Sequence, residues 1–194
     1  MRIIYVTGTP GTGKTEVATL LAKRLKGEHI NLGKICLEKG YVQRLNQTTE
    51  SPILNLNKIT QYVKQIISKK SQPLIFDAHF TVKIPRRLKP IFIVLRCEPT
   101  ELLKRLTKKG FYKKKKYENV WAEILDFCLQ ETLAFSASVY EINTTGKKAE
   151  NVVGEIQRIL RYKKKPITGI CDWIKTLEDD NQLEKMLFLG EKTI

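Results

Sequence analysis

The chain has 194 residues and a hydrophobic content of 42%, which suits one compact domain with a real core and excludes a disordered chain. Its formal net charge of +15 indicates a polyanionic partner, namely nucleotide phosphates, RNA or both, with a solvated lysine-rich surface of the kind found in thermophiles as the alternative. The first residues show no signal-peptide pattern and the apolar run at 90–95 is far too short to span a bilayer, so we expect a soluble protein without a membrane partner.

The four cysteines are scattered along the chain, with no CxxC pair among them and two histidines in the whole sequence. This spacing fits neither a zinc site nor a disulfide framework. We interpret the cysteines as small buried residues and expect the protein to be cytoplasmic, because the cytoplasm keeps thiols reduced.

Apolar patterning predicts an alternation of strands and helices. The strand segments are continuous apolar runs, as expected of parallel strands covered on both faces, and the helical segments repeat apolar residues every three or four positions. In chain order we predict a strand at 2–7, a helix at 16–26, a short strand at 29–31, a helix at 56–68, strands at 73–78 and 91–96, helices at 99–107 and 117–135, a weaker strand at 139–142 and a helix at 149–161. This order predicts an α/β fold with a mainly parallel sheet.

The segment GTPGTGKT, Gly8–Thr15, lies between the first strand and the first helix and matches the pattern G-x-x-x-x-G-K-[ST] in full. Glycines at Gly8, Gly11 and Gly13 leave the backbone N–H groups open to phosphate oxygens, and the start of the following helix adds its positive dipole end. Lys14 is then placed to reach the β- and γ-phosphates, and the Thr15 hydroxyl to bind Mg²⁺. The motif predicts a nucleoside triphosphate site.

A carboxylate that supports Mg²⁺ is expected at the end of another parallel strand, and PLIFDAH supplies Asp77 there. His79 follows two residues later, on the same side of an extended chain. We interpret His79 as a group that orients water or handles a proton near the γ-phosphate, with a purely structural histidine as the alternative.

The run KKGFYKKKK, at 108–116, holds six lysines in nine residues beside aromatic side chains. Three interpretations stay open: a mobile lid that closes over the triphosphate, a patch that contacts RNA, or a solvated loop. Arg96 and Arg105 are further candidates for phosphate contacts, although Arg105 could instead lie on the solvent face of its helix.

A basic run followed by proline and glycine, KKKPITG at 163–169, marks the one boundary in the chain. Beyond it, two short amphipathic sets surround the polar sequence EDDN. We predict a helical appendage at 163–194 that packs either on the core or on a partner.

Together with the Gly8–Thr15 motif, the sequences DAH, VLRCEPTELLKRLTKKGF and ENVWAEIL resemble the adenylate kinase isoenzyme 6 family, small adenylate-kinase-like NTPases that act in maturation of the small ribosomal subunit. The likeness is strong over residues 1–162 and weaker over the tail DWIKTLEDDNQLEKML. It implies a P-loop kinase core with a five-stranded parallel sheet, a nucleoside monophosphate region near 31–54 and a short lid near 108–118.

The resemblance also implies roles for single residues. Asp77 and His79 would serve ATP hydrolysis, and Lys109 of the lid would touch the nucleotide. The residues implied in ATP binding are Gly11, Gly13, Lys14, Thr15 and Glu16. The implied activities are a weak, broad monophosphate kinase and an ATPase, and the implied partner is a ribosomal protein of the small-subunit platform, with an influence on late rRNA cleavage.

Two departures from the family pattern concern the acceptor. Lys109 stands where the family usually has arginine, and a lysine cannot form the bidentate fork that clamps a phosphoryl group. The stretch GYVQRLNQTTES, at 40–51, also differs from the family's monophosphate region. Two functions therefore stay open. One is a Mg²⁺-ATP-dependent nucleoside monophosphate kinase with ATPase activity, and the other is an ATPase switch for ribosome assembly. The motifs favour less a third hypothesis, a kinase of the shikimate type that acts on another small molecule.

Overall fold

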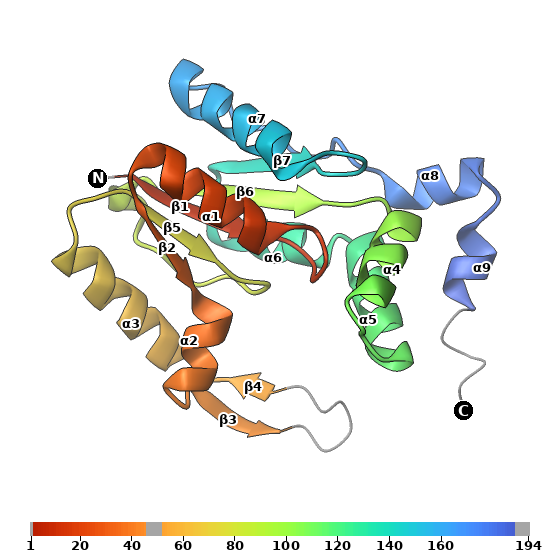
Figure 1. Cartoon of the computed structure of the whole chain (residues 1–194), viewed down its shortest axis with the longest axis horizontal. Coiled ribbons are helices and arrows are strands. Elements are labelled where there is room, and N and C mark those ends of the chain that lie inside the picture. Colours follow the sequence, from red (N-terminus) through yellow and green to blue (C-terminus); the bar gives the residue numbers. More distant parts are fainter. Residues whose placement is uncertain (1, 46–51, 189–194) are drawn as a thin grey trace.

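Five parallel strands form the central sheet, in the order β2-β5-β1-β6-β7 (Figure 1). This computed structural model describes residues 2–45 and 52–188. The strands are β1 Ile3–Thr7, β2 Glu28–Asn31, β5 Leu74–Asp77, β6 Ile91–Arg96 and β7 Val139–Asn143. The predicted α/β class, the five parallel strands and their approximate positions are confirmed.

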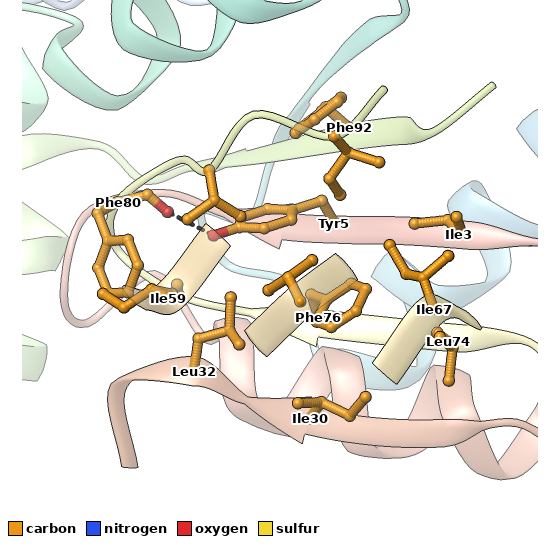
Figure 2. Packing of buried hydrophobic residues seen from close by; sticks show 14 of the residues in the cluster. Ile3, Tyr5, Ile30, Leu32, Ile59, Ile67, Leu74, Phe76, Phe80 and Phe92 are labelled. Atoms are coloured by element: carbon orange, nitrogen blue, oxygen red, sulfur yellow. Dashed lines mark hydrogen bonds between the residues drawn. The ribbon is translucent and has the colours of Figure 1, made fainter. Parts of the chain in front are cut away.

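Helices cover both faces of this sheet, which is why its strands read as continuous apolar runs. On one face lie α1 (Lys14–Leu25) and α7 (Ala149–Tyr162), which pack on the side of β1 that carries Ile4 and Val6. On the other face lie α2 (Leu32–Glu38), α3 (Leu56–Lys69) and α6 (Phe127–Phe135). Figure 2 shows Tyr5 on this face together with Leu32 of α2 and Ile59 and Ile67 of α3. The Tyr5 hydroxyl donates to the carbonyl of Phe80 at 2.7 Å, so this buried polar group is satisfied.

The remaining helices gather beyond the carboxyl ends of the strands (Figure 1). They are α4 Pro99–Lys108, α5 Lys113–Ile124, α8 Trp173–Asp179 and α9 Leu183–Leu187. A separate antiparallel hairpin pairs β3 (Val42–Leu45) with β4 (Pro52–Leu54), and a 3₁₀ turn spans Arg86–Leu88. The sequence reading did not predict α2, β3 or β4, because segments of three to seven residues are too short to show a period. Within the described part of the chain, no helix combines the length and the apolar content needed to cross a membrane.

The single helix predicted at 117–135 is wrong: the structure has two helices, α5 and α6, that meet at Leu125 and Asp126. Asp126 adopts a left-handed conformation, with φ of 56° and ψ of 24°, which ends one helix and redirects the chain into the next. Its carboxylate pairs with the buried Arg96 guanidinium, and α6 then buries Leu129 against the sheet. Tertiary contacts therefore interrupt an apolar pattern that reads as continuous in the sequence.

The C-terminal segment docks on the core of its own chain. Ile167 forms a parallel bridge with Tyr140 of β7, and the N–H of Ile170 donates to the Glu141 carboxylate at 2.9 Å. Trp173 and Leu177 of α8 are buried beside α4 and α5. Of the two arrangements predicted for the appendage, packing on the core is the one observed.

Arg96 is the centre of a buried ionic cluster at the end of β6. Its guanidinium reaches Glu123 at 2.7 Å and Glu141 at 2.6 Å, and it also pairs with Asp126. Burial alone would lower the pKa of Arg96, but these carboxylates outweigh it and raise the pKa above its usual value. The prediction that Arg96 contacts phosphate is wrong, because its side chain is only 1% exposed and its N–H groups are taken by carboxylates.

The four cysteines are all buried and carry free thiols, as the sequence predicted. Burial raises the pKa of Cys97 to about 12 and that of Cys128 to about 11, so both thiols stay protonated and unreactive.

We predict that Arg96→Met strongly destabilises the fold, because it leaves three carboxylates without their shared cation. The expected loss is about 3–5 kcal/mol in the free energy of unfolding, measured by urea denaturation. Arg24→Met is the matched control, since the exposed Arg24 guanidinium donates to Gln157 on the surface and should cost less than about 1 kcal/mol. Equal urea midpoints for the two variants would contradict this prediction.

Candidate functional site

The glycine-rich loop between β1 and α1 lies at the carboxyl edge of the sheet and needs glycine for two separate reasons. Gly8 and Gly11 have φ of 137° and 97°, a region that residues with a side chain rarely adopt. A Cβ at Gly8 would also lie 2.3 Å from the carbonyl oxygen of Leu95, and one at Gly11 would lie 2.7 Å from a methyl carbon of Leu102. The loop is therefore held close to β6 and α4, and its path depends on the missing side chains.

The loop leads directly into the N-terminus of α1. Gly13 is the residue before the helix, and no side chain caps it, so the N–H groups of the first turn are not satisfied by a side-chain cap. A helix start with free N–H groups and a positive dipole end favours an anion. This agrees with the phosphate-binding conformation predicted from the sequence.

The Lys14 side chain is folded back into the loop. Its ammonium group donates to the carbonyl of Thr9 at 3.1 Å, and the Thr12 hydroxyl donates to the same carbonyl at 2.9 Å. Burial lowers the pKa of Lys14, while the nearby Asp77 and Glu123 carboxylates act in the opposite direction. Lys14 is thus the cation placed inside the phosphate-binding loop.

Asp77 is the meeting point of three side chains at the ends of two neighbouring strands. Its Oδ2 accepts from the Thr15 hydroxyl at 2.7 Å and from the Asn31 amide at 2.8 Å, and the His29 ring nitrogen Nε2 lies 3.4 Å away. Burial alone would raise the pKa of Asp77, but the hydrogen bonds from His29 and Thr15 and the charge of Lys14 outweigh it and hold the pKa below its usual range. Asp77 is therefore an anion at neutral pH.

The Thr15 hydroxyl and the Asp77 carboxylate form a pair of oxygen donors, the ligand type that Mg²⁺ prefers. The sequence predicted this pair but missed the two supporting residues, His29 and Asn31. Their positions in the predicted short strand at 29–31 could have indicated this role. In the structure, β2 and β5 are parallel neighbours, and Asn31 is the register partner of Asp77. Polar residues that end adjacent parallel strands come together at one edge of the sheet.

His79 lies two residues beyond Asp77, exposed on the surface of the site. Its ring packs edge-on against Phe80, with 5.4 Å between ring centres. Partial removal from solvent lowers the pKa of His79 to about 4, and the charges of Lys14 and Lys115 act in the same direction. With its pKa lowered, the imidazole is neutral at physiological pH.

A cavity of about 600 Å³ adjoins the glycine-rich loop. Its walls come from Gly11 and Gly13, from the start of α1, from the end of α4, from the loop after β7 and from the start of α7, and its acidic lining residues are Glu16 and Glu150. Its basic lining residues are Arg105, Lys108, Lys109, Lys147 and Lys148. This concentration of positive charge beside a phosphate-binding loop is suited to a ligand that carries several negative charges.

Arg105 takes part in the wall of this cavity and does not lie on the solvent face of its helix, the alternative that the sequence left open. Its guanidinium donates to the carbonyl of Thr144 at 3.0 Å and pairs with Glu101 one turn earlier in α4. The sequence reading missed Lys147 and Lys148, because they lie in a turn after β7 with no motif of their own.

The segment predicted as a lid, 108–118, is mostly helical. It comprises the last residue of α4, the connection 109–112 and the first half of α5. Lys109 caps the end of α4 and lines the cavity beside the loop. Lys115 pairs with Glu118 at 3.2 Å within α5.

The predicted monophosphate region, near 31–54, holds α2 and the β3–β4 hairpin, and residues 46–51 lie outside the described part of the chain. A cavity of about 460 Å³ opens beside it between β2, α2 and α3. Lys34 is the single lysine or arginine in its described lining, and Lys34 faces Glu38 at 3.6 Å. The two sides of the glycine-rich loop therefore differ sharply in charge.

Solved structures support the fold. A shikimate kinase from Acinetobacter baumannii, bound to shikimate, superimposes with a TM-score of 0.59 at 16% identity and covers 84% of this chain and 95% of its own. A thymidylate kinase from Candida albicans gives a TM-score of 0.56 at 14% identity, covering 84% of this chain and 92% of its own. At such low identity these likenesses establish the P-loop kinase architecture alone.

Whole-chain relatives are more informative. A family model described as an AAA domain matches residues 4–126. A protein named "Putative adenylate kinase" from Thermococcus onnurineus is 34% identical over 189 residues, which cover 97% of this chain and 99% of the relative. A protein of the same name from Pyrococcus furiosus is 37% identical over 177 residues, which cover 91% of this chain and 94% of the relative. A third, from Methanocaldococcus jannaschii, is 35% identical over 182 residues, covering 93% and 98%. Similarity over nearly the full length of both chains shows that this chain belongs to the archaeal family of proteins named as adenylate kinases.

Proposed function

We propose that this chain is a cytoplasmic, Mg²⁺-dependent enzyme that transfers the terminal phosphoryl group of ATP to a nucleoside monophosphate of the AMP type, and that hydrolyses ATP when no acceptor is bound. One observation carries the proposal. Lys14 lies inside a glycine-rich loop that adjoins a basic cavity, and the Thr15–Asp77 oxygen pair lies where this loop enters α1. Family membership supports the adenylate kinase type of acceptor.

The roles of the residues follow from their positions. Phosphoryl transfer depends mainly on positioning and on stabilising negative charge. The N–H groups of the Gly8–Thr15 loop would hold the triphosphate, and Lys14 would exchange the Thr9 carbonyl for the β- and γ-phosphate oxygens. Thr15 and Asp77 would hold Mg²⁺, which when bound neutralises charge on those phosphates.

Other residues would act at the edges of this site. Glu16 and Lys109 line the basic cavity and would contact the ATP, with Lys109 moving as part of a short lid at 108–118. His79, as a neutral imidazole, can accept a hydrogen bond from water and so orient it for hydrolysis. We assign the hydrolytic role to His79 because it is exposed beside Asp77 and not used in the core.

A second candidate function is an ATPase switch for ribosome assembly, in which hydrolysis releases a platform ribosomal protein or rRNA and no acceptor is phosphorylated. One observation favours it. In the described lining of the cavity beside α2, Lys34 is the single strong cation, and it faces Glu38. An acceptor monophosphate normally needs a denser set of cations or an arginine fork.

Nucleotide chromatography after incubation with Mg²⁺-ATP, with and without AMP, separates the two functions. We expect two ADP formed for each AMP consumed, because transfer converts both nucleotides to ADP. Lys14→Ala should lower this activity by at least about a hundredfold, since it removes the cation from the phosphate-binding loop. ADP and free phosphate that form at a rate independent of AMP would reject the kinase in favour of the switch, and a Lys14→Ala activity within severalfold of wild type would reject the site.

The metal-binding proposal predicts that Asp77→Asn raises the Mg²⁺ concentration needed for half-maximal turnover by about tenfold or more, because an amide oxygen carries no charge. The measurement is a Mg²⁺ titration of ATP turnover at saturating ATP. Asn31→Ala is the matched control, since it removes a hydrogen bond to Asp77 but leaves the carboxylate in place. Identical Mg²⁺ curves for wild type and Asp77→Asn would show that Asp77 does not hold the metal.

The basic start of α5 gives a third test, directed at the RNA partner. Replacing Lys113 and Lys114 by glutamate should weaken binding of a short single-stranded RNA, followed by fluorescence anisotropy, and leave ATP affinity unchanged. Acidic residues in the first turn of a helix are favourable, so the fold should tolerate the change. RNA binding that stays at the wild-type level would exclude this surface, and equal losses of RNA and ATP binding would assign the lysines to the nucleotide site.

A further inference from the structure

The Glu123 carboxylate, on α5, joins two parts of the chain that are distant in sequence. Its Oε2 accepts a hydrogen bond of 2.5 Å from the Thr9 hydroxyl in the glycine-rich loop. Its Oε1 accepts one of 3.0 Å from the Trp173 indole N–H in the C-terminal segment. Glu123 and Thr9 are almost fully buried and Trp173 is 5% exposed, so water does not compete freely for these contacts.

At the Trp173 end of this connection, several neighbouring groups hold the Glu123 carboxylate in place. Besides the indole, Oε1 of Glu123 accepts from Arg96 Nε at 2.7 Å and from the N–H of Cys97 at 3.1 Å. The Arg96 guanidinium also lies over the Trp173 ring, 5.7 Å from its centre. The indole therefore completes a set of three donors that fixes the orientation of the Glu123 carboxylate.

The Thr9 end leads to the proposed phosphate-binding lysine. While the Thr9 side chain is held by Glu123, the Thr9 carbonyl accepts from the Lys14 ammonium and from the Thr12 hydroxyl. The position of Thr9 therefore sets both the curve of the loop and the place where the Lys14 ammonium rests. A continuous path of hydrogen bonds runs from Trp173 through Glu123 and Thr9 to Lys14.

The C-terminal helices are so short that their stability depends on how they dock on the core. Helices α8 and α9 have seven and five residues, too few to be stable in isolation. Beyond Trp173, their described apolar contacts in this region come from Leu177, Leu183 and Met186, which join one small cluster with residues of α4 and α5. Docking that rests on a few side chains is sensitive to the order of the carboxylate beneath it.

We propose that the C-terminal segment is a positioning element of the nucleotide site, in which Trp173 orients Glu123, and Glu123 holds Thr9 and thereby the loop that carries Lys14. Nucleotide binding and docking of α8 then stabilise each other, because coupling between two binding events is reciprocal. A partner that captured α8 would loosen the loop and weaken nucleotide binding. The inference rests on the proposed function only in requiring that the loop binds a nucleoside triphosphate; it does not require turnover or a particular acceptor.

A double-mutant cycle on ATP binding tests the connection. The binding constant of a fluorescent ATP analogue is measured for the full chain, for Trp173→Phe, for Thr9→Val and for the double variant. Trp173→Phe keeps a ring over Arg96 but removes the N–H donor, and Thr9→Val removes the hydroxyl at nearly constant volume. We expect each single change to weaken binding by about threefold to tenfold, and the double variant to be no more than about twofold weaker than the poorer single variant, since both break one path.

Matched controls separate positioning from general loss of packing. Trp121→Phe makes the same substitution on α5, the helix that carries Glu123, and should leave ATP affinity within twofold of wild type. Thr9→Ser keeps the hydroxyl and should restore most of the affinity that Thr9→Val loses. Single effects that multiply in the double variant, or a Trp173→Phe affinity within twofold of wild type, would overturn the inference.

Hydrogen exchange on the unmodified chain provides a test that no substitution can confound. Saturating ATP should slow amide exchange in α8 and α9 as well as in the glycine-rich loop, because binding stabilises docking. Protection of the loop with unchanged exchange in α8 would overturn the inference while leaving the proposed function intact. A wild-type chain that fails to bind the ATP analogue would instead overturn the proposed function itself.

Discussion

The Arg96 guanidinium, at the carboxyl end of β6, is buried away from water. It forms ion pairs with three carboxylates, those of Glu123, Asp126 and Glu141. Each of these carboxylates belongs to a different part of the fold: α5, the break between α5 and α6, and β7. A buried guanidinium without partners would be very costly, so these elements must assemble around it together. The same cluster holds the break between two helices, the end of the sheet and the C-terminal segment in one arrangement, immediately behind the phosphate-binding loop.

This cluster explains how a loop rich in glycine keeps a defined shape. Glycine makes the loop conformation accessible but also leaves it many alternatives, and hydrogen bonds must select one of them. On one side, Glu123 holds Thr9, whose carbonyl receives Lys14. On the other side, Asp77 holds Thr15 at the start of α1. The two carboxylates thus anchor the loop near both of its ends, which favours a preorganised anion site over one that forms only on binding.

Charge is distributed unequally around the site, and this bears on the choice between a kinase and a switch. The cavity beside the loop that adjoins α4 is lined by five basic residues, which suits the triphosphate donor. The cavity beside α2 offers Lys34 opposite Glu38 among its described residues. Relatives that cover nearly the whole chain are named as putative adenylate kinases, and the proposed acceptor of the AMP type rests on that similarity. The chemistry that both functions share, nucleophilic attack at the terminal phosphate, needs only the donor side.

Local pattern determined the fold class, the order of the five strands along the chain, the glycine-rich loop and the Thr15–Asp77 pair, because buried parallel strands and phosphate loops depend on residues that are close in sequence. Tertiary structure alone decided the break at Asp126, the burial of Arg96, the joining of His29 and Asn31 to Asp77, and the docking of Trp173 on Glu123. Each of these depends on a charge or hydrogen-bonding group meeting a partner dozens of residues away. Hydrophobic periodicity records which face of an element is buried, but it does not record which buried polar groups satisfy one another.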